Sequence, residues 1–178
     1  MERKSFKDME CPIAQALEHV GEWWSILIIR EAFYGAKRFD EFQQGLEGIA
    51  PNTLTKRLKS LVEKGLLEKV PYSKRPVRYE YVLTECGKSF YPIMTMLLDW
   101  SNKYFAKDGV KVQLQNIKTK EIAIPFIGDK NTGTEMNLHD YKIVAGPNAS
   151  KSLCQKIDSQ SNINQINKNI NEMNGELI

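Results

Sequence analysis

Side chains that can contact DNA bases and phosphates gather in one stretch of the sequence, residues 49–83. When the start of this stretch is placed on a helix at 100° per residue, Leu54, Leu58 and Leu61 share one face. The polar residues on the opposite face and its flanks are Asn52, Thr53, Lys56, Arg57, Lys59 and Ser60. Arginine can make two hydrogen bonds to guanine and asparagine two to adenine, so these residue types predict base contacts in the major groove. The competing interpretation is the solvated face of an ordinary amphipathic helix.

A short basic hairpin is expected directly after this helix. Gly65 should end the helix, because glycine enters the left-handed conformation at little cost. Two β-prone runs, 66–72 and 78–83, then flank a turn at 73–76. We expect phosphate or minor-groove contacts from the basic residues of this turn and its edge, Lys74, Arg75 and Arg78. Alternatively, the charged tip only protects the strand edges from aggregation.

A helix with a polar, basic face followed by such a hairpin predicts a winged helix-turn-helix. This fold lays its second helix in the major groove and its wing on the flanking backbone. The segment from Pro51 to Arg78 holds eight basic and two acidic residues, a local charge of +6, whereas the whole chain of 178 residues carries only +3. Positive charge is therefore concentrated in this segment, and double-stranded DNA is the expected partner.

The three cysteines predict neither a metal site nor a disulfide framework. Cys11, Cys86 and Cys154 are far apart in the sequence and odd in number. No apolar leader follows the charged first residues, and the longest apolar run, 23–29, is too short to span a bilayer. We therefore expect a cytoplasmic protein with reduced thiols and no membrane partner.

The sequence contains no arrangement of residues that indicates catalysis. His19 and His139 are the only histidines, and neither has a cysteine or a carboxylate at a metal-ligand spacing. The chain also lacks a glycine-rich phosphate-binding loop and a nucleophile elbow. We expect no enzyme activity, no cofactor and no bound metal.

Helices are expected on both sides of the candidate recognition helix. Three precede it, at about residues 12–20, 23–34 and 38–46, and the second is apolar almost all round, as is typical of a buried centre. After the hairpin, Thr84 is expected to cap a long helix that reaches about Ala106. Pro92 lies inside that helix and should kink it or remove one hydrogen bond. Of its two apolar stripes, one can cover the core and the other suggests a second subunit.

The remaining sequence is divided by its composition. Short β-prone runs at 110–114, 122–127 and 141–144 predict strands in a small extension. From residue 148 the chain is rich in asparagine, although isoleucines from Ile163 onwards repeat at helical spacing. The expected fold is mainly α with a small β wing (α+β), followed by the β-rich appendage and a polar tail. Its parts are a polar arm at 1–10, the winged helix-turn-helix at 11–106, the β-rich extension at 107–147, and a tail at 148–178 that is disordered or a weak helix.

Motifs along residues 11–106 resemble those of a known family. They are Cys11-Pro12-Ile13, Gly21-x-Trp23, Arg38-Phe39-x-Glu41, Leu54-Thr55-x-Arg57-Leu58 and Pro76-x-Arg78-x-Glu80-Tyr81. In this order they resemble the HxlR-type regulators, winged helix-turn-helix transcriptional regulators of bacteria that are related in architecture to the MarR group. The resemblance implies a homodimer bound to a palindromic operator, as a repressor or an activator.

The resemblance also implies roles for residues outside the DNA-binding face. The family dimer is built from the first and last helices of the domain, which gives a candidate interface of Ile13, Leu17, Leu97, Trp100 and Tyr104. Some members sense electrophiles or oxidants through an N-terminal cysteine, so Cys11 is a candidate redox sensor. A helix N-terminus stabilises a thiolate, which favours this role. Alternatively, Cys11 is a small residue packed beside the dimer helix.

Two residues depart from the family pattern. Ala50 stands where a serine often precedes the recognition helix, so the capping hydrogen bond must come from Asn52 or Thr53 or be lost. Cys86 stands where leucine is usual, which suggests a role in core packing. Two further functions stay open: a thiol-based sensor in which Cys11 controls the release of DNA, and a protein-interaction module formed by the C-terminal extension. The open partners include a small-molecule or oxidant effector.

Overall fold

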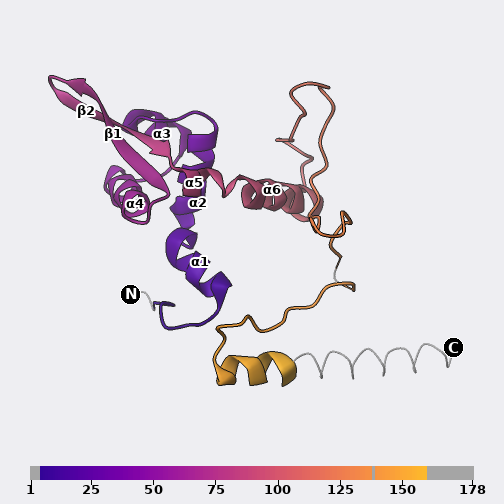
Figure 1. Ribbon diagram of the computed structural model, residues 1–178. Coiled ribbons are helices and arrows are strands. Elements are labelled where there is room, and N and C mark those ends of the chain that lie inside the picture. The colour runs from indigo at the N-terminus through magenta and orange to yellow at the C-terminus, as the bar shows by residue number, and fades with distance from the viewer. Residues whose placement is uncertain (1–4, 138, 160–178) are drawn as a thin grey trace. The chain divides into compact units, whose positions relative to one another are not determined.

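The computed structural model describes residues 5–137 and 139–159 of the protein (Figure 1). The chain divides into two units, residues 1–126 and residues 127–178. The predicted isoleucine repeat, from Ile163 onwards, lies outside the described residues. The helices and strands of the first unit are, in order, α1 (Pro12–Val20), α2 (Trp23–Phe33), α3 (Phe39–Gly45), α4 (Pro51–Glu63), β1 (Leu67–Lys74), β2 (Val77–Leu83), α5 (Glu85–Lys88) and α6 (Tyr91–Phe105). This order confirms the predicted winged helix-turn-helix, mainly α with a small β wing.

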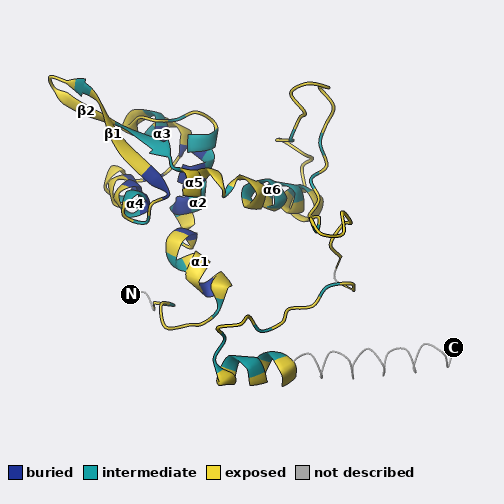
Figure 2. Cartoon of the chain, in the orientation of Figure 1, coloured by how far each residue is buried: buried dark blue, intermediate teal, exposed yellow. Residues whose placement is uncertain are grey.

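The core lies where α2, α3 and α4 meet the base of the hairpin, at the dark blue positions of Figure 2. Ile28 and Ile29 of α2 are fully buried, and Leu54, Leu58 and Leu61 of α4 are at most 1% exposed. Burying one such side chain contributes about 1.5–3 kcal/mol. The predicted leucine stripe therefore attaches α4 to the domain by its inner face and leaves the outer face to solvent.

Helix α2 is not buried all round, so that prediction was wrong for its ends. Its buried positions lie between Ser25 and Glu31. Trp23 is 90% exposed at the start of the helix, and Tyr34, just beyond its end, is 64% exposed. The helix is longer than the core that covers it, and the apolar composition of the sequence does not reveal this.

Gly65 ends α4 as predicted. It adopts a positive φ of 72°, the conformation that glycine enters most readily. The amide of Leu66 donates to the carbonyl of Leu61 at 2.9 Å, and the amide of Gly65 donates to that of Val62 at 3.0 Å. This pair of hydrogen bonds is a Schellman motif, which satisfies the last carbonyls of the helix and turns the chain into β1.

The long helix predicted after Thr84 is instead two helices. Thr84 caps the short helix α5, where its hydroxyl accepts a hydrogen bond from the amide of Gly87 at 3.0 Å. A new helix, α6, begins at Tyr91 with Pro92 in its first turn. Proline has no N–H to donate to the carbonyl four residues earlier, so α5 cannot continue through it, whereas the first turn of a helix tolerates it.

Cys86 is exposed on α5, so the predicted core packing role was wrong. The buried residue of this short helix is its neighbour, Gly87. A Cβ at Gly87 would come within 2.1 Å of the carbonyl oxygen of Leu66. The backbone of α5 therefore approaches the start of the hairpin too closely for a side chain, and the preceding residue points away from the core.

The extension is less regular than predicted. Among the described residues after Phe105, the only β pairings are single bridges, between Gln115 and Ile122 and between Gly128 and Glu135. The prediction of strands at 110–114, 122–127 and 141–144 was therefore wrong, because these segments do not form β-ladders. Their apolar, β-branched composition favours extended backbone, but a strand also needs a neighbour in register over several residues. Residues 151–159 of the second unit are helical.

Candidate nucleic-acid interface

The outer face of α4 is polar and open to solvent. Asn52, Lys56 and Lys59, three of the predicted contact residues, are exposed, whereas Thr53 and Ser60 are half-buried on the flanks. Thr55 is also exposed beside Lys56, and its hydroxyl donates to the carbonyl of Pro51 at 2.9 Å. Thr55 was not among the predicted contact residues, although its angle of about 100° from Leu54 places it on the flank of this face.

Arg57 occupies a different environment from the rest of this set. Its guanidinium Nη2 lies 2.7 Å from Oε2 of Glu22, which directly precedes α2. The Nε atom of Arg57 is buried and has no hydrogen-bond partner among the described residues. The structure therefore places this arginine on the flank of α4 that faces the start of α2. A base contact by Arg57 stays a prediction, and it competes with this ion pair.

The N-terminus of α4 is weakly capped. Ala50 occupies the N-cap position, and no side chain of the described residues provides the cap there, so the hydrogen bond expected from Asn52 or Thr53 is lost. Pro51 follows in the first turn, where it removes one amide that would need a partner. The end of α4 that carries Asn52 is thus held by the buried leucines and by the helical φ angle that the ring of Pro51 imposes.

The hairpin carries the other predicted contact residues at its tip. Lys74, Arg75 and Arg78 are all exposed. The strands extend farther than predicted, to Lys74 in β1 and from Val77 in β2. The two strands are antiparallel, and Lys74 pairs with Val77, Ser73 with Arg78 and Pro71 with Tyr79, so Tyr72 is an extra residue that forms a bulge.

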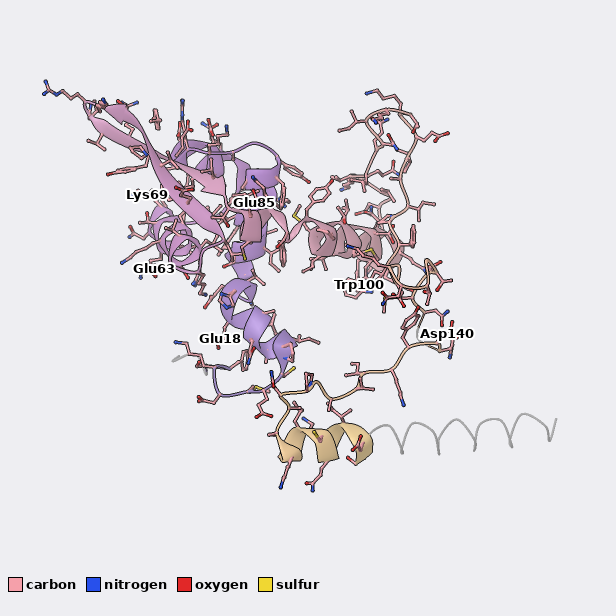
Figure 3. The ribbon with its side chains drawn as sticks, viewed as in Figure 1. Glu18, Glu63, Lys69, Glu85, Trp100 and Asp140 are labelled. Atoms are coloured by element: carbon pink, nitrogen blue, oxygen red, sulfur yellow. The ribbon has the colours of Figure 1, made fainter. Side chains whose placement is uncertain are left out.

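Aromatic rings hold basic side chains along the hairpin. The ammonium of Lys69, labelled in Figure 3, lies 4.0 Å from the centroid of the Tyr79 ring. The guanidinium of Arg38, just before α3, lies 4.6 Å from the centroid of the Tyr72 ring. Such cation–π contacts hold a charge in place without neutralising it. They add Lys69 to the positive surface of the wing, whereas Arg38 is also paired with the carboxylate of Glu80. Sequence spacing could not have paired either cation with its ring.

Hydrogen bonds connect the base of the hairpin to α3. Arg38 Nε donates to Oε1 of Glu80 at 3.3 Å, and this bond raises the pKa of the Arg38 guanidinium above its ordinary value. The carboxylate of Glu41 accepts from the amides of Lys37 at 2.7 Å and Arg38 at 2.9 Å. These amides lower the pKa of Glu41 below its usual 4.5. The amide of Tyr81 in turn donates to the carbonyl of Lys37 at 2.7 Å, so the hairpin and the start of α3 are held together.

The candidate dimer residues form exposed apolar surface on α1 and α6. Their exposed fractions are 69% for Ile13, 40% for Leu17, 42% for Leu97, 52% for Trp100 and 61% for Tyr104. The Trp100 ring, labelled in Figure 3, packs edge-on against Phe105 with 4.9 Å between centroids. Large apolar side chains exposed in such numbers are typical of a surface that another molecule covers. A cavity of about 300 Å³ lies between α2, α6 and residues 112–114.

Cys11 is the N-cap residue of α1, at the helix N-terminus where it was predicted, and the structure shows that it is partly buried. Cys154 is also partly buried, in the helical segment 151–159. Within residues 5–137 and 139–159, no three His, Cys, Asp or Glu side chains are grouped as a metal site would need. In the same part of the chain, no helix has both the length and the apolar character needed to cross a bilayer.

Comparison with known proteins gives the family. The sequence model of the HxlR-like helix-turn-helix matches residues 19–109, about half of the chain. The chain belongs to this family. The matched region runs from the end of α1 through α6, so it contains the outer face of α4 and the whole hairpin. HxlR-like proteins are DNA-binding transcription regulators, and this chain is a transcriptional regulator of the helix-turn-helix type.

Curated relatives carry the same description. The HTH-type transcriptional regulator Rv3095 of Mycobacterium tuberculosis is 38% identical over 136 residues, which covers 76% of this chain and 85% of the relative. YdeP of Bacillus subtilis, another HTH-type transcriptional regulator, is 32% identical over 94 residues, which covers 53% of this chain and 73% of the relative. The first of these alignments is longer than the family match.

Two solved structures are similar over most of this HxlR-like chain. PA1607, described as a transcription factor, has a TM-score of 0.72 at 33% identity and covers 80% of this chain and 100% of its own. PA1374 of Pseudomonas aeruginosa, also described as a transcription factor, has a TM-score of 0.60 at 46% identity and covers 82% of this chain and 99% of its own. Coverage of four fifths requires residues beyond 109, so part of the segment after α6 is shared with these structures.

Proposed function

We propose that this HxlR-like protein acts as a homodimer on a palindromic operator, with α4 in the major groove and the hairpin on the flanking backbone. The observation that carries the proposal is the joint exposure of two surfaces: the polar outer face of α4 and the basic tip of the hairpin. Both belong to the segment with a local charge of +6. A winged helix-turn-helix uses these two elements for groove and backbone contacts.

The residues divide into two roles. Asn52, Lys56 and Lys59, with Thr53, Thr55 and Ser60 beside them, are assigned to the groove, because side-chain amides and ammonium groups discriminate base edges. Lys74, Arg75 and Arg78 are assigned to phosphates or the minor groove, because they lie at the exposed hairpin tip. Loss of a groove residue should reduce specificity, and loss of a tip residue should weaken all DNA binding and its salt dependence.

Dimerisation is supported by the apolar surface of α1 and α6. Ile13 and Leu17 on α1, and Leu97, Trp100 and Tyr104 on α6, are each at least 40% exposed. A two-fold dimer would cover the same surface on both copies and present two α4 helices to successive major grooves. Light scattering tests this step, with a mass twice that of the 20.5 kDa chain as the expected result.

Selection of bound sites from random double-stranded DNA tests the function as a whole. The expected result is an enriched inverted repeat with half-sites about one helical turn apart, or a multiple of it. Gel-shift titration then compares the selected site with a scrambled duplex at fixed salt. Equal affinity for the two duplexes would contradict sequence-specific recognition, and a single unrepeated site would contradict the dimer on a palindrome.

A thiol-based sensor is a second candidate function. Cys11 stands at the start of α1, two residues before the exposed Ile13, so a modified thiol would lie beside the proposed dimer surface. Under this proposal an oxidant or a quinone lowers the DNA affinity of wild-type protein and not that of Cys11→Ser. Equal loss of affinity in both proteins would remove Cys11 from the mechanism.

A protein-interaction role for the extension is the third candidate. Ile117, Ile124 and Phe126 are between 67% and 84% exposed, which suggests a surface that binds another molecule. Removal of all residues after Ala106 tests this idea by light scattering and gel shift. A truncated protein that is still dimeric and binds DNA with unchanged affinity would make the extension dispensable for both.

A further inference from the structure

The ion pair between Glu22 and Arg57 joins two parts of the fold that are distant in sequence. Glu22 stands between α1 and α2, and Arg57 lies in the middle of α4. Only 26% of the Glu22 side chain and 29% of the Arg57 side chain are exposed. At this burial the two charges attract each other through less water than a surface pair does, and a guanidinium–carboxylate contact also fixes orientation.

A second contact holds the C-terminal end of α4 to the same region. The ammonium of Lys64, the C-cap residue of α4, donates to the backbone carbonyls of Glu18 and His19 at the end of α1. Glu18 and Glu63, both labelled in Figure 3, mark the ends of α1 and α4 that approach each other here. Arg57 and Lys64 are seven residues apart, about 10 Å along the helix. Two contacts at this separation fix both the position and the rotation of α4.

The leucine stripe alone does not fix the rotation as tightly. Leu54, Leu58 and Leu61 attach one face of α4, but apolar contacts have no preferred direction. A small rotation about the helix axis would keep most of their burial and would move Asn52 and Lys56 across the bases. The ion pair opposes this rotation, because its attraction weakens as the two charged atoms, now 2.7 Å apart, are separated.

We infer that Glu22 is a positioning residue for DNA recognition: through Arg57 it fixes the rotation of α4 relative to the junction of α1 and α2. The inference rests on the proposed function, since it concerns the same DNA-binding face. In this role Arg57 contributes to operator binding through Glu22 and not through a base. The geometry also links the DNA-reading helix to α1, whose exposed face is assigned above to the dimer.

The test compares binding to the selected operator and to a scrambled duplex for wild type, Glu22→Gln, Arg57→Lys and the double variant. Arg57→Lys keeps the positive charge but loses the planar guanidinium. Glu85→Gln is the matched control, because it removes one negative charge from an exposed pair with Lys88 (2.6 Å) on α5, outside the proposed DNA-binding face. Relative to this control, each single variant is expected to weaken operator binding about tenfold and to change scrambled-duplex binding about twofold or less. The double variant should lose no more than either single one.

Two results would overturn the inference. One is operator binding by Glu22→Gln equal to that of Glu85→Gln while Arg57→Lys binds weakly, which would mean that Arg57 contacts DNA by itself. The other is a double variant whose loss is the product of the single losses, which would make the two residues independent. Thermal unfolding of each variant shows that it is folded at the assay temperature, and Glu22→Asp, which keeps the charge but shortens the side chain by one methylene, provides the test if Glu22→Gln is not. A wild-type protein without site preference would overturn the proposed function and this inference together.

Discussion

Helices α4 and α6 both carry apolar stripes at helical spacing, yet these stripes have different environments. Leu54, Leu58 and Leu61 of α4 are at most 1% exposed. No residue of α6, which is described along its whole length, is buried, and Leu97 and Trp100 are 42% and 52% exposed. The same periodicity therefore serves the core of one chain in α4 and an uncovered surface in α6. A stripe in a sequence shows that a face will be covered, but not which molecule will cover it.

The largest effect expected from this comparison concerns the leucines themselves. Leu58→Ala should lower the free energy of unfolding by about 2–5 kcal/mol, because it leaves a cavity under α4. Leu97→Ala should change the stability of the isolated chain much less and should instead raise the dissociation constant of the dimer. Denaturant unfolding measures the first effect, and light scattering over a range of concentrations measures the second. Similar destabilisation of an isolated chain by both changes would contradict the distinction between the two helices.

The short helix α5, which connects the hairpin to α6, is expected to be sensitive to the addition of one methyl group. Gly87→Ala should destabilise the protein by about 1–3 kcal/mol, because the new Cβ would lie 2.1 Å from the backbone oxygen of Leu66. Gly146→Ala is the control, since no described atom lies within 4 Å of its Cβ position. Thermal unfolding of the two variants gives the comparison. A stable Gly87→Ala protein would show that α5 can move away from the hairpin freely.

A gain of stability is expected from a substitution at the N-terminus of α4. Ala50→Ser should supply the missing N-cap hydrogen bond and add about 0.5–1 kcal/mol to the free energy of unfolding. The same assay applies, with wild-type Ala50 as the comparison, since alanine lacks the hydroxyl. If serine and alanine give the same midpoint, the start of α4 does not adopt the capped geometry.

The smallest expected effect is a dependence on pH at the base of the hairpin. The amides of Lys37 and Arg38 lower the pKa of Glu41 below its usual 4.5. A carboxylate with a lowered pKa stabilises the folded state above its unfolded pKa, and this stability is lost as the pH falls through the folded value. Glu41→Gln should therefore melt slightly below wild type at pH 7, and the difference should shrink as the pH falls below 4.5 and through the lowered pKa of Glu41. A constant difference across this range would assign the effect to packing instead of charge.

The sequence was most informative where structure depends on neighbours along the chain. The spacing of Leu54, Leu58 and Leu61, the conformational freedom of Gly65 and the run of basic residues to Arg78 were enough to predict α4 and the wing. The cap at Thr84 was predicted as well. The helix that Thr84 caps ends four residues after it, because Pro92 requires a new helix to begin. These features depend on contacts within a few residues, which sequence patterns record directly.

Features that depend on distant contacts could not be predicted. Glu22 and Arg57 are 35 positions apart, and no spacing rule joins a loop residue to the flank of a helix at that separation. The exposure of Trp23 and Cys86 depends on how far the core extends, which composition does not show. The strands predicted in the extension failed for a related reason, because β-prone residues form a ladder only when a partner segment lies in register.

The bulge at Tyr72 has a consequence for the geometry of the wing. Residues paired directly across two strands share a face of the sheet, so Ser73 lies on the face of Arg78 and Lys74 lies on the face of Val77 and Tyr79. If Tyr72 instead paired with Arg78 in a regular ladder, strict alternation would place Lys74 on the same face as Arg78. The bulge thus separates these two cations onto opposite sides of the ribbon. A thin ribbon with cations on both sides presents positive charge in two directions and can attract phosphates on either side of it.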